Sequence, residues 1–93
     1  MTATRVQQIE IKLQQNLQPS DLAVIDESHL HVGHAGARDG RGHFRVNIVS
    51  PHFEGLTPLA RHRLVFAALA DLMTTDIHAL SIQAVTPAEN SPL

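Results

Sequence analysis

The stretch HFRVNIVS, residues 43–50, has the clearest structural pattern in the chain. Phe44, Val46 and Ile48 are apolar and alternate with polar residues. A period of two residues is typical of a strand with one buried face. Such a strand needs neighbours along its edges and a hydrophobic layer against its apolar face. The rest of the chain must supply both.

Two further segments are predicted strands. Leu22–Ser28 is the first, with Val24 and Ile25 as its expected core residues. Ile77–Val85 is the last, because it is rich in apolar residues and a proline follows closely. Between the first strand and the middle one, His29–Gly42 contains four glycines and no regular period, which predicts a long, mobile loop.

The hydrophobic layer is predicted to come from two helices. The first spans Thr4–Leu17 and begins at a capping box, in which Thr4 and Gln7 satisfy free backbone N–H groups. Its apolar residues are spaced by three and four positions, which places them on one face. The second helix runs from Pro58 to about Met73 and follows a threonine that is a favourable N-cap.

The buried face of the second helix is predicted to centre on His62. We expect this ring to be buried with its N–H group satisfied, because it lies in the middle of the apolar face. Leu64 is expected to be exposed on the polar side. The predicted members of the buried face are Leu59, His62, Phe66, Leu69 and Met73, with Val65 and Leu72 widening it.

The order helix, strand, strand, helix, strand predicts an α+β fold, in which a three-stranded sheet has its helices on one face. The 93 residues are enough for one domain, and a hydrophobic content of 43% is typical of a folded one. The tail Ala88–Leu93 is expected to be frayed. No apolar run is long enough to span a membrane, so the cytoplasm is the expected location.

The chain has no cysteine and seven histidines. The lack of cysteine excludes disulfides, a thiolate nucleophile and a self-contained cysteine-ligated zinc or iron–sulfur site. Histidine is the commonest metal-binding side chain. We find no arrangement of residues typical of a catalytic site, and the net charge of -2 argues against a protein that mainly binds phosphates. A non-enzymatic binding protein is therefore predicted.

Three parts of the sequence resemble the BolA family, and together they cover most of the chain. The middle part is the most specific, because a Phe-x-Gly, a short spacer and Arg-His-Arg-x-Val follow the central strand in that order. The resembling segments are DES (26–28), HFRVNIVS (43–50), FEG (53–55), RHRLV (61–65), IHALSI (77–82) and TP (86–87).

The resemblance implies an α-β-β-α-α-β fold similar to a type II KH domain. It also implies a partnership with a monothiol glutaredoxin and a role in iron homeostasis or iron–sulfur maturation. In such complexes the family supplies a histidine from the last strand and a Cys or His from the loop after the first strand. The strand ligand corresponds to His78, and the loop ligand to His34 or His31, with His34 slightly favoured. A [2Fe–2S] cluster would be shared, with the partner and glutathione supplying the thiolates.

Plainer interpretations remain open for the same histidines. His78 alternates in phase with Leu80, so it could face the core and bond a carbonyl group. The loop residues His29, His31 and His34 could form a zinc site, although a closed structural site usually needs four ligands. Each of them could also be an ordinary solvated side chain.

The rival function is nucleic-acid binding by a transcriptional regulator, through the KH-like fold and the Arg61-His62-Arg63 helix. The predicted contact residues, for nucleic acid or for a protein partner, are Arg45, Arg61, Arg63 and Leu64. Phosphate contacts would make such binding strongly salt-dependent. A negative net charge and an aromatic content of 3% count against this function, since single-strand binders stack bases on aromatic rings.

Overall fold

The computed structural model describes residues 4–31 and 41–90. The predicted α-β-β-α-α-β order and the α+β class are confirmed. In chain order the elements are α1 (Arg5–Leu17), β1 (Asp21–Asp26), the 3-10 turn η1 (Ser28–His31), β2 (Gly42–Val49), the 3-10 turn η3 (Pro51–Phe53), α2 (Pro58–Ala68), α3 (Ala70–Met73) and β3 (Ile77–Val85).

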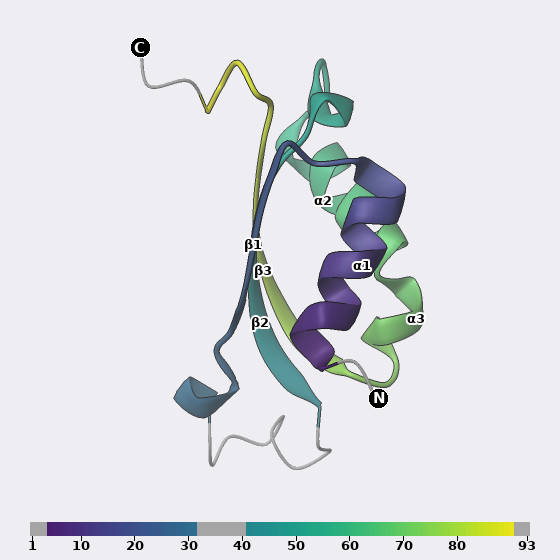
Figure 1. The fold of residues 1–93 in the computed structure, drawn as a ribbon, viewed down its shortest axis with the longest axis vertical. Coiled ribbons are helices and arrows are strands. Elements are labelled where there is room, and N and C mark those ends of the chain that lie inside the picture. The colour runs from purple at the N-terminus through teal and green to yellow at the C-terminus, as the bar shows by residue number, and fades with distance from the viewer. Residues whose placement is uncertain (1–3, 32–40, 91–93) are drawn as a thin grey trace.

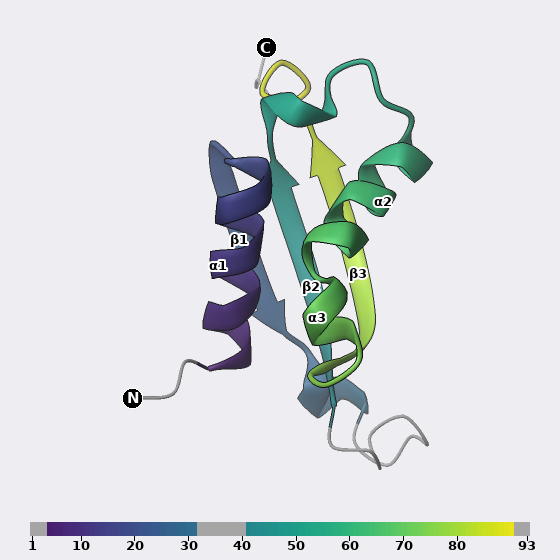
Figure 2. The same cartoon turned by 90° about the vertical axis from the view of Figure 1, so that its right-hand side faces the viewer.

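The three strands form one mixed sheet in the order β1-β2-β3. β1 pairs antiparallel with β2, and β3 pairs parallel with β2. Figure 1 shows the sheet edge-on, with α1, α2 and α3 all on one side of it. In Figure 2, α1 lies over the β1 side while α2 and α3 lie over the β3 side. No described element covers the opposite face of the sheet.

The first helix is built as its sequence predicts. The Thr4 hydroxyl accepts from the backbone N–H of Gln7 at 3.1 Å, and the Gln7 side chain accepts from the backbone N–H of Thr4 at 2.9 Å. This reciprocal pair satisfies two of the free N–H groups at the helix start. The stripe facing the sheet is buried at Ile9, Leu13 and Leu17.

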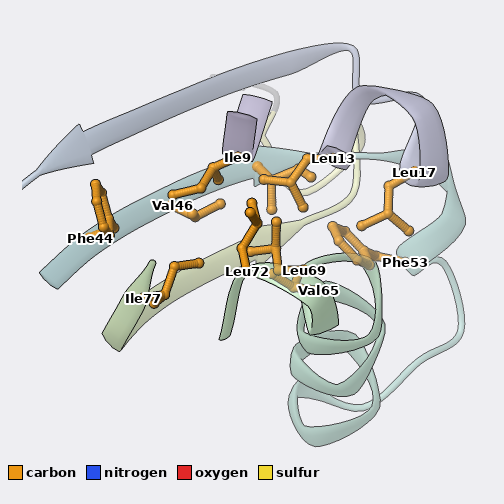
Figure 3. Packing of buried hydrophobic residues seen from close by; sticks show 11 residues of the cluster. Ile9, Leu13, Leu17, Phe44, Val46, Phe53, Val65, Leu69, Leu72 and Ile77 are labelled. Carbon is orange, nitrogen blue, oxygen red and sulfur yellow. The ribbon is translucent and has the colours of Figure 1, made fainter. Parts of the chain in front are cut away.

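The core lies between the helices and the apolar face of β2 (Figure 3). Phe44, Val46 and Ile48 are at most 2% exposed, which confirms the alternation expected of the central strand. Burying a side chain of this size contributes roughly 1.5–3 kcal/mol, so this one strand face is a large part of the stabilisation. The other members of the cluster are Ile9, Leu13, Leu17, Phe53, Val65, Leu69, Leu72 and Ile77.

The second helix differs from its prediction in length and in orientation. It ends at Ala68, and Leu69, with φ -103° and ψ 10°, separates it from α3. Leu59 is 59% exposed and Phe66 is 39% exposed, whereas the buried face is made by Val65, Leu69 and Leu72. Val65, Leu69 and Leu72 were predicted and are buried, whereas Leu59 and Phe66 are not, because apolar residues occur all round this helix and the break resets the 100° step.

Three side chains predicted from sequence periodicity lie differently. His62 is partly exposed and not buried, and Leu64 packs against the core although it was expected to be exposed. Ile25 is 43% exposed, so its assignment to the core is wrong. The reason is strand alternation, because Val24 packs on the core and its neighbour must point to the open face.

Ser50 joins three elements at one end of the sheet. Its side chain is fully buried, and its hydroxyl donates to the carbonyl oxygen of Leu17 at 2.6 Å. The same hydroxyl accepts from the N–H of His52 at 3.1 Å, while the Ser50 N–H donates to the carbonyl oxygen of Val85 at 3.0 Å. One residue thus connects the ends of α1, β2 and β3.

Ser50→Ala is expected to lower the free energy of unfolding by about 1–3 kcal/mol, because it leaves the buried carbonyl of Leu17 and the partly buried N–H of His52 without this partner. Urea denaturation measures the loss. Ser81→Ala is the matched control, since Ser81 is exposed on β3. Equal losses for the two variants would show that the Ser50 hydroxyl does not hold these elements together.

Candidate functional site

His78 lies at the start of β3 and is exposed. The pairing with β2 shifts register here, because Gly42 faces Ile77 while the next residue, His43, faces Ala79. The extra residue of this irregularity is His78, and such a bulge re-aims a side chain. Its neighbour Ile77 is fully buried, so the histidine points away from the core. The interpretation of His78 as a core residue is therefore wrong.

A second imidazole lies beside it. The ring centroids of His43 and His78 are 5.3 Å apart, and their planes are inclined by 45°. Metal–nitrogen distances of about 2.0–2.1 Å put two imidazoles on one tetrahedral ion at a centroid separation of roughly 5 Å. The observed separation is close to this value, and it is also an ordinary spacing for two rings in tilted contact.

The sequence prediction left His43 without a role. Parallel pairing of β2 with β3 brings it next to His78, and that pairing is a long-range property of the fold. One local feature of the sequence indicates that His43 and His78 lie side by side. Each of the two strands has a histidine as its second residue, and parallel strands that start together bring such residues side by side.

Short contacts from the end of β1 hold the start of β2. The N–H of His43 donates to the Ser28 hydroxyl at 3.1 Å, and the N–H of Glu27 donates to the His43 carbonyl at 2.8 Å. Asp26 accepts from the Ser28 N–H at 2.9 Å. The hydrogen bond from the Ser28 side chain, together with that N–H, lowers the pKa of Asp26 below its ordinary value. The backbone of His43 is thus fixed independently of its ring.

Gly42 allows this close approach. A Cβ atom at this position would lie 2.7 Å from the Phe44 ring and 2.7 Å from the Ser28 hydroxyl. The N–H of Gly42 donates to the carbonyl oxygen of Asp76 at 2.9 Å, which ties β2 to the turn before β3. A glycine is needed here because a side chain would push β2 away from η1.

The predicted loop ligands are not placed by the structure. His34 lies outside the described residues, and for His31 only the backbone, at the end of η1, is described. His29 is exposed. Within residues 4–31 and 41–90, no three histidine, aspartate or glutamate side chains are grouped to hold a metal ion. The described pair alone would be too few ligands for a metal site.

The predicted contact residues do not share one surface. Arg45 belongs to the open face of the sheet and pairs with Glu27 at 3.2 Å, whereas Arg63 is exposed on α2, on the helical side. The side chain of Arg61 is only 12% exposed. Its guanidinium donates to the carbonyl oxygens of Leu56 at 3.0 Å and Ala84 at 3.1 Å. Arg61 is thus held within the fold.

A hydrogen-bonded turn follows β3. Glu89 accepts from Arg61 at 2.6 Å and from the N–H of Thr86 at 2.8 Å, and the N–H of Asn90 donates to the carbonyl oxygen of Thr86 at 3.1 Å. Residues 88–90, part of the tail expected to be frayed, are therefore ordered here. The hydrogen bonds from Arg61, with that from Thr86, lower the pKa of Glu89 from 4.5 to about 2.

In the described ranges, no helix has the length and hydrophobicity needed to cross a membrane.

Comparison with known proteins relates this fold to the BolA family. The BolA family model, described as "BolA-like protein", matches residues 13–89. BolA-like protein 1 of Pongo abelii is 51% identical over 88 residues, which are 91% of this chain and 62% of that protein. The Vibrio cholerae protein named DNA-binding transcriptional regulator BolA is 47% identical over 81 residues, covering 87% of this chain and 74% of that protein.

The solved structure of BolA1 from Arabidopsis thaliana matches with a TM-score of 0.82 at 38% identity, covering 97% of this chain and all of that one. The fold and the site together define a small α+β domain with one helical layer and a histidine pair at one end of its sheet. The chain belongs to the BolA family. It spans 56–62% of the length of the first curated relatives that it matches.

Glu89→Gln is expected to remove a pH-dependent part of the stability. Because the folded pKa of Glu89 lies below its ordinary value of 4.5, its contribution is fully present above that pH and is lost as the pH falls towards about 2. Wild type should exceed Glu89→Gln in free energy of unfolding at neutral pH, and the difference should vanish by the low end of this range.

Denaturation at a series of pH values measures this difference. Glu54→Gln, at an exposed residue after η3, is the control. A difference between wild type and Glu89→Gln that persists unchanged to the lowest pH would contradict the pairing of Glu89 with Arg61.

Proposed function

We propose that this chain is a non-enzymatic adaptor that binds a monothiol glutaredoxin and shares a histidine-ligated [2Fe–2S] cluster with it. The observation behind the proposal is the exposed His78, which lies on a bulge with a second imidazole 5.3 Å away. The adaptor would act in iron–sulfur cluster maturation or transfer, or in iron homeostasis. The cytoplasm stays its predicted location.

Because this chain has no thiolate ligands of its own, a [2Fe–2S] cluster bound to it must be shared with a partner. Two imidazoles can ligate one iron of a [2Fe–2S] cluster, as long as thiolates hold the other iron. This chain has no cysteine, so both thiolates must come from outside it. The glutaredoxin cysteine and glutathione are the proposed sources. A bound cluster of this type would supply a transferable iron–sulfur unit, whose reduction potential is raised by neutral imidazole ligands.

The identity of the second ligand is the open part of the proposal. His34 and His31 remain the predicted loop ligands, with His34 slightly favoured. His43 is a third candidate that comes from the structure, since its ring is already next to His78. Substitution of each residue in turn shows which of the three candidates is the second ligand.

The alternative function is nucleic-acid binding. The name of the Vibrio cholerae relative, a DNA-binding transcriptional regulator, favours it. The distribution of the arginines does not, because Arg45 and Arg63 lie on opposite sides of the sheet and Arg61 is held by Glu89. If this function holds, nucleic-acid binding should weaken steeply with salt, and substitution of Arg61 and Arg63 should reduce it more than loss of His78.

The adaptor proposal is tested by anaerobic cluster reconstitution of a monothiol glutaredoxin with this protein and glutathione. Visible absorption and circular dichroism should show a heterodimer spectrum that differs from that of the glutaredoxin homodimer. His78→Ala should return the spectrum to the homodimer form, because one iron loses an imidazole. His52→Ala is the control, since His52 is exposed at η3, at the opposite end of the sheet.

A wild-type spectrum identical to that of glutaredoxin alone would refute cluster sharing. If His78→Ala keeps the heterodimer spectrum, His78 is not a ligand. With sharing established, whichever of His31→Ala, His34→Ala and His43→Ala removes the heterodimer spectrum identifies the second ligand.

A further inference from the structure

The outer edge of β3 is an unpaired strand edge. In the sheet order β1-β2-β3, β3 has β2 on one side, and among the described residues no strand lies on its other side. Alternate residues of β3 bond to β2, and Val85 is one of them, because its carbonyl oxygen accepts from the N–H of Ser50. In a parallel ladder this directs the N–H and C=O groups of Leu80 and Ile82 outward. Such backbone groups can pair with another strand.

Part of this edge is already covered. Ala84 points outward like Leu80 and Ile82, and its carbonyl oxygen accepts from Arg61 at 3.1 Å. The outward backbone groups of Leu80 and Ile82 have no hydrogen-bond partner within residues 4–31 and 41–90. The N–H and C=O groups of these two residues are therefore the free part of the edge.

The two edge strands of the sheet differ in length and charge. β1 has six residues, and Asp21 and Asp26 stand at its two ends. β3 has nine residues and contains no Asp, Glu, Lys or Arg. Short edges and charged side chains are common protections against pairing with another chain. β1 has both of these protections, whereas β3 has neither.

The helix-facing side chains of β3 are incompletely covered at the same edge. Leu80 and Ile82 pack against the core but are only partly buried. In Figure 2 the first turn of α2 extends past β3, so a strand added at this edge would lie beneath it. That turn contains Leu59, whose side chain is 59% exposed. An added strand with apolar residues on its helix-facing side would therefore gain apolar contacts.

We propose that the outer edge of β3 is a dimerisation surface, and that it pairs with β3 of a second copy of this chain. A two-fold axis beside Ser81 places the two strands antiparallel, with Leu80 opposite Ile82 of the second copy. The free N–H and C=O groups of both residues then all have a partner. The two three-stranded sheets join into one continuous sheet.

A second copy fits this edge because the edge is complementary to itself. Leu80 and Ile82 become cross-strand neighbours on the helical side, where apolar pairs stabilise a sheet. Ser81, which is small and exposed, meets its own copy at the axis. No like charges meet along the strand, because β3 has none of the four charged residue types. This association involves the free chain alone and does not depend on cluster sharing.

Sedimentation velocity of the free protein over a range of concentrations is the first test. A dimer of about twice the 10.2 kDa chain mass should form as the concentration rises. Ser81→Asp should weaken the dimer about fivefold or more, because two carboxylates would lie opposite each other at the axis. Ser81→Ala should associate like wild type. A wild type that stays monomeric up to millimolar concentration would overturn the proposal, even if a strand of another protein binds this edge.

Ala23→Asp is the matched control for the charge. It adds the same carboxylate at an exposed residue of β1, the other edge strand. Its association should equal that of wild type. Equal weakening by Ala23→Asp and Ser81→Asp would show that the dimer responds to net charge and would refute an axis beside Ser81.

Cross-linking tests the position of the axis. The chain has no cysteine, so Ser81→Cys carries a single thiol. Opposite residues in a non-hydrogen-bonded antiparallel pair have Cα atoms about 4.5 Å apart, which is within the range of a disulfide. Oxidation by diamide should cross-link Ser81→Cys roughly tenfold or more faster than Ala23→Cys, because only the first variant holds two thiols side by side. Equal rates would rule out this pairing.

Hydrogen exchange of the wild type tests the same pairing without a substitution. The N–H groups of Leu80 and Ile82 should exchange more slowly as the concentration rises, because they become bonded only in the dimer. Those of Leu22 and Val24, which point outward from β1, should not change. A dimer in which Leu80 and Ile82 gain no protection would have its interface elsewhere, and the proposal would be wrong.

Discussion

The parallel pairing of β2 with β3 is the constraint from which the rest of the structure follows. Parallel neighbours need a crossover connection, and α2 and α3 provide it while covering the apolar face of the sheet. That coverage buries Phe44, Val46 and Ile48 of the central strand. The same pairing makes both strands begin at one end of the sheet, where the rings of His43 and His78 meet.

The two ends of the sheet are built differently. At one end, Ser50 connects three elements through buried hydrogen bonds, and Arg61 holds the turn that contains Glu89. At the other end lie η1, Gly42 and the bulge at His78. Here the backbone is fixed by contacts such as that of the His43 N–H with Ser28, while His78 stays exposed. A site needs this combination, because a ligand must be accessible and its backbone must be rigid.

Local patterns in the sequence were enough to predict several elements. The capping box at Thr4, the alternation around Val46 and the strand Ile77–Val85 each depend on neighbours in sequence, and all are confirmed. Ile25 and Phe66 were both predicted to be buried, and both predictions were wrong for the same reason. Each lies in a segment whose apolar residues point in more than one direction, so the buried face is selected by tertiary packing.

The site was predictable only in part, for a similar reason. The resemblance to the BolA family pointed to His78, whereas its position on a bulge depends on the register between two strands far apart in sequence. The closeness of the His43 ring to His78 depends on the same register. No periodicity within either strand contains this information. The pairing of His43 and His78 is seen only once the starts of β2 and β3 are placed next to each other in the fold.

The central claim, that this chain supplies imidazole ligands to a shared cluster, is tested most directly by pulsed EPR of the reduced heterodimer. The chain would be labelled with ¹⁵N-histidine and the glutaredoxin and glutathione left unlabelled, so that the nitrogen couplings report on this chain alone. The account predicts strong ¹⁵N couplings from directly bound imidazole, and loss of one of them in His78→Ala. A spectrum without ¹⁵N coupling to the cluster would contradict it.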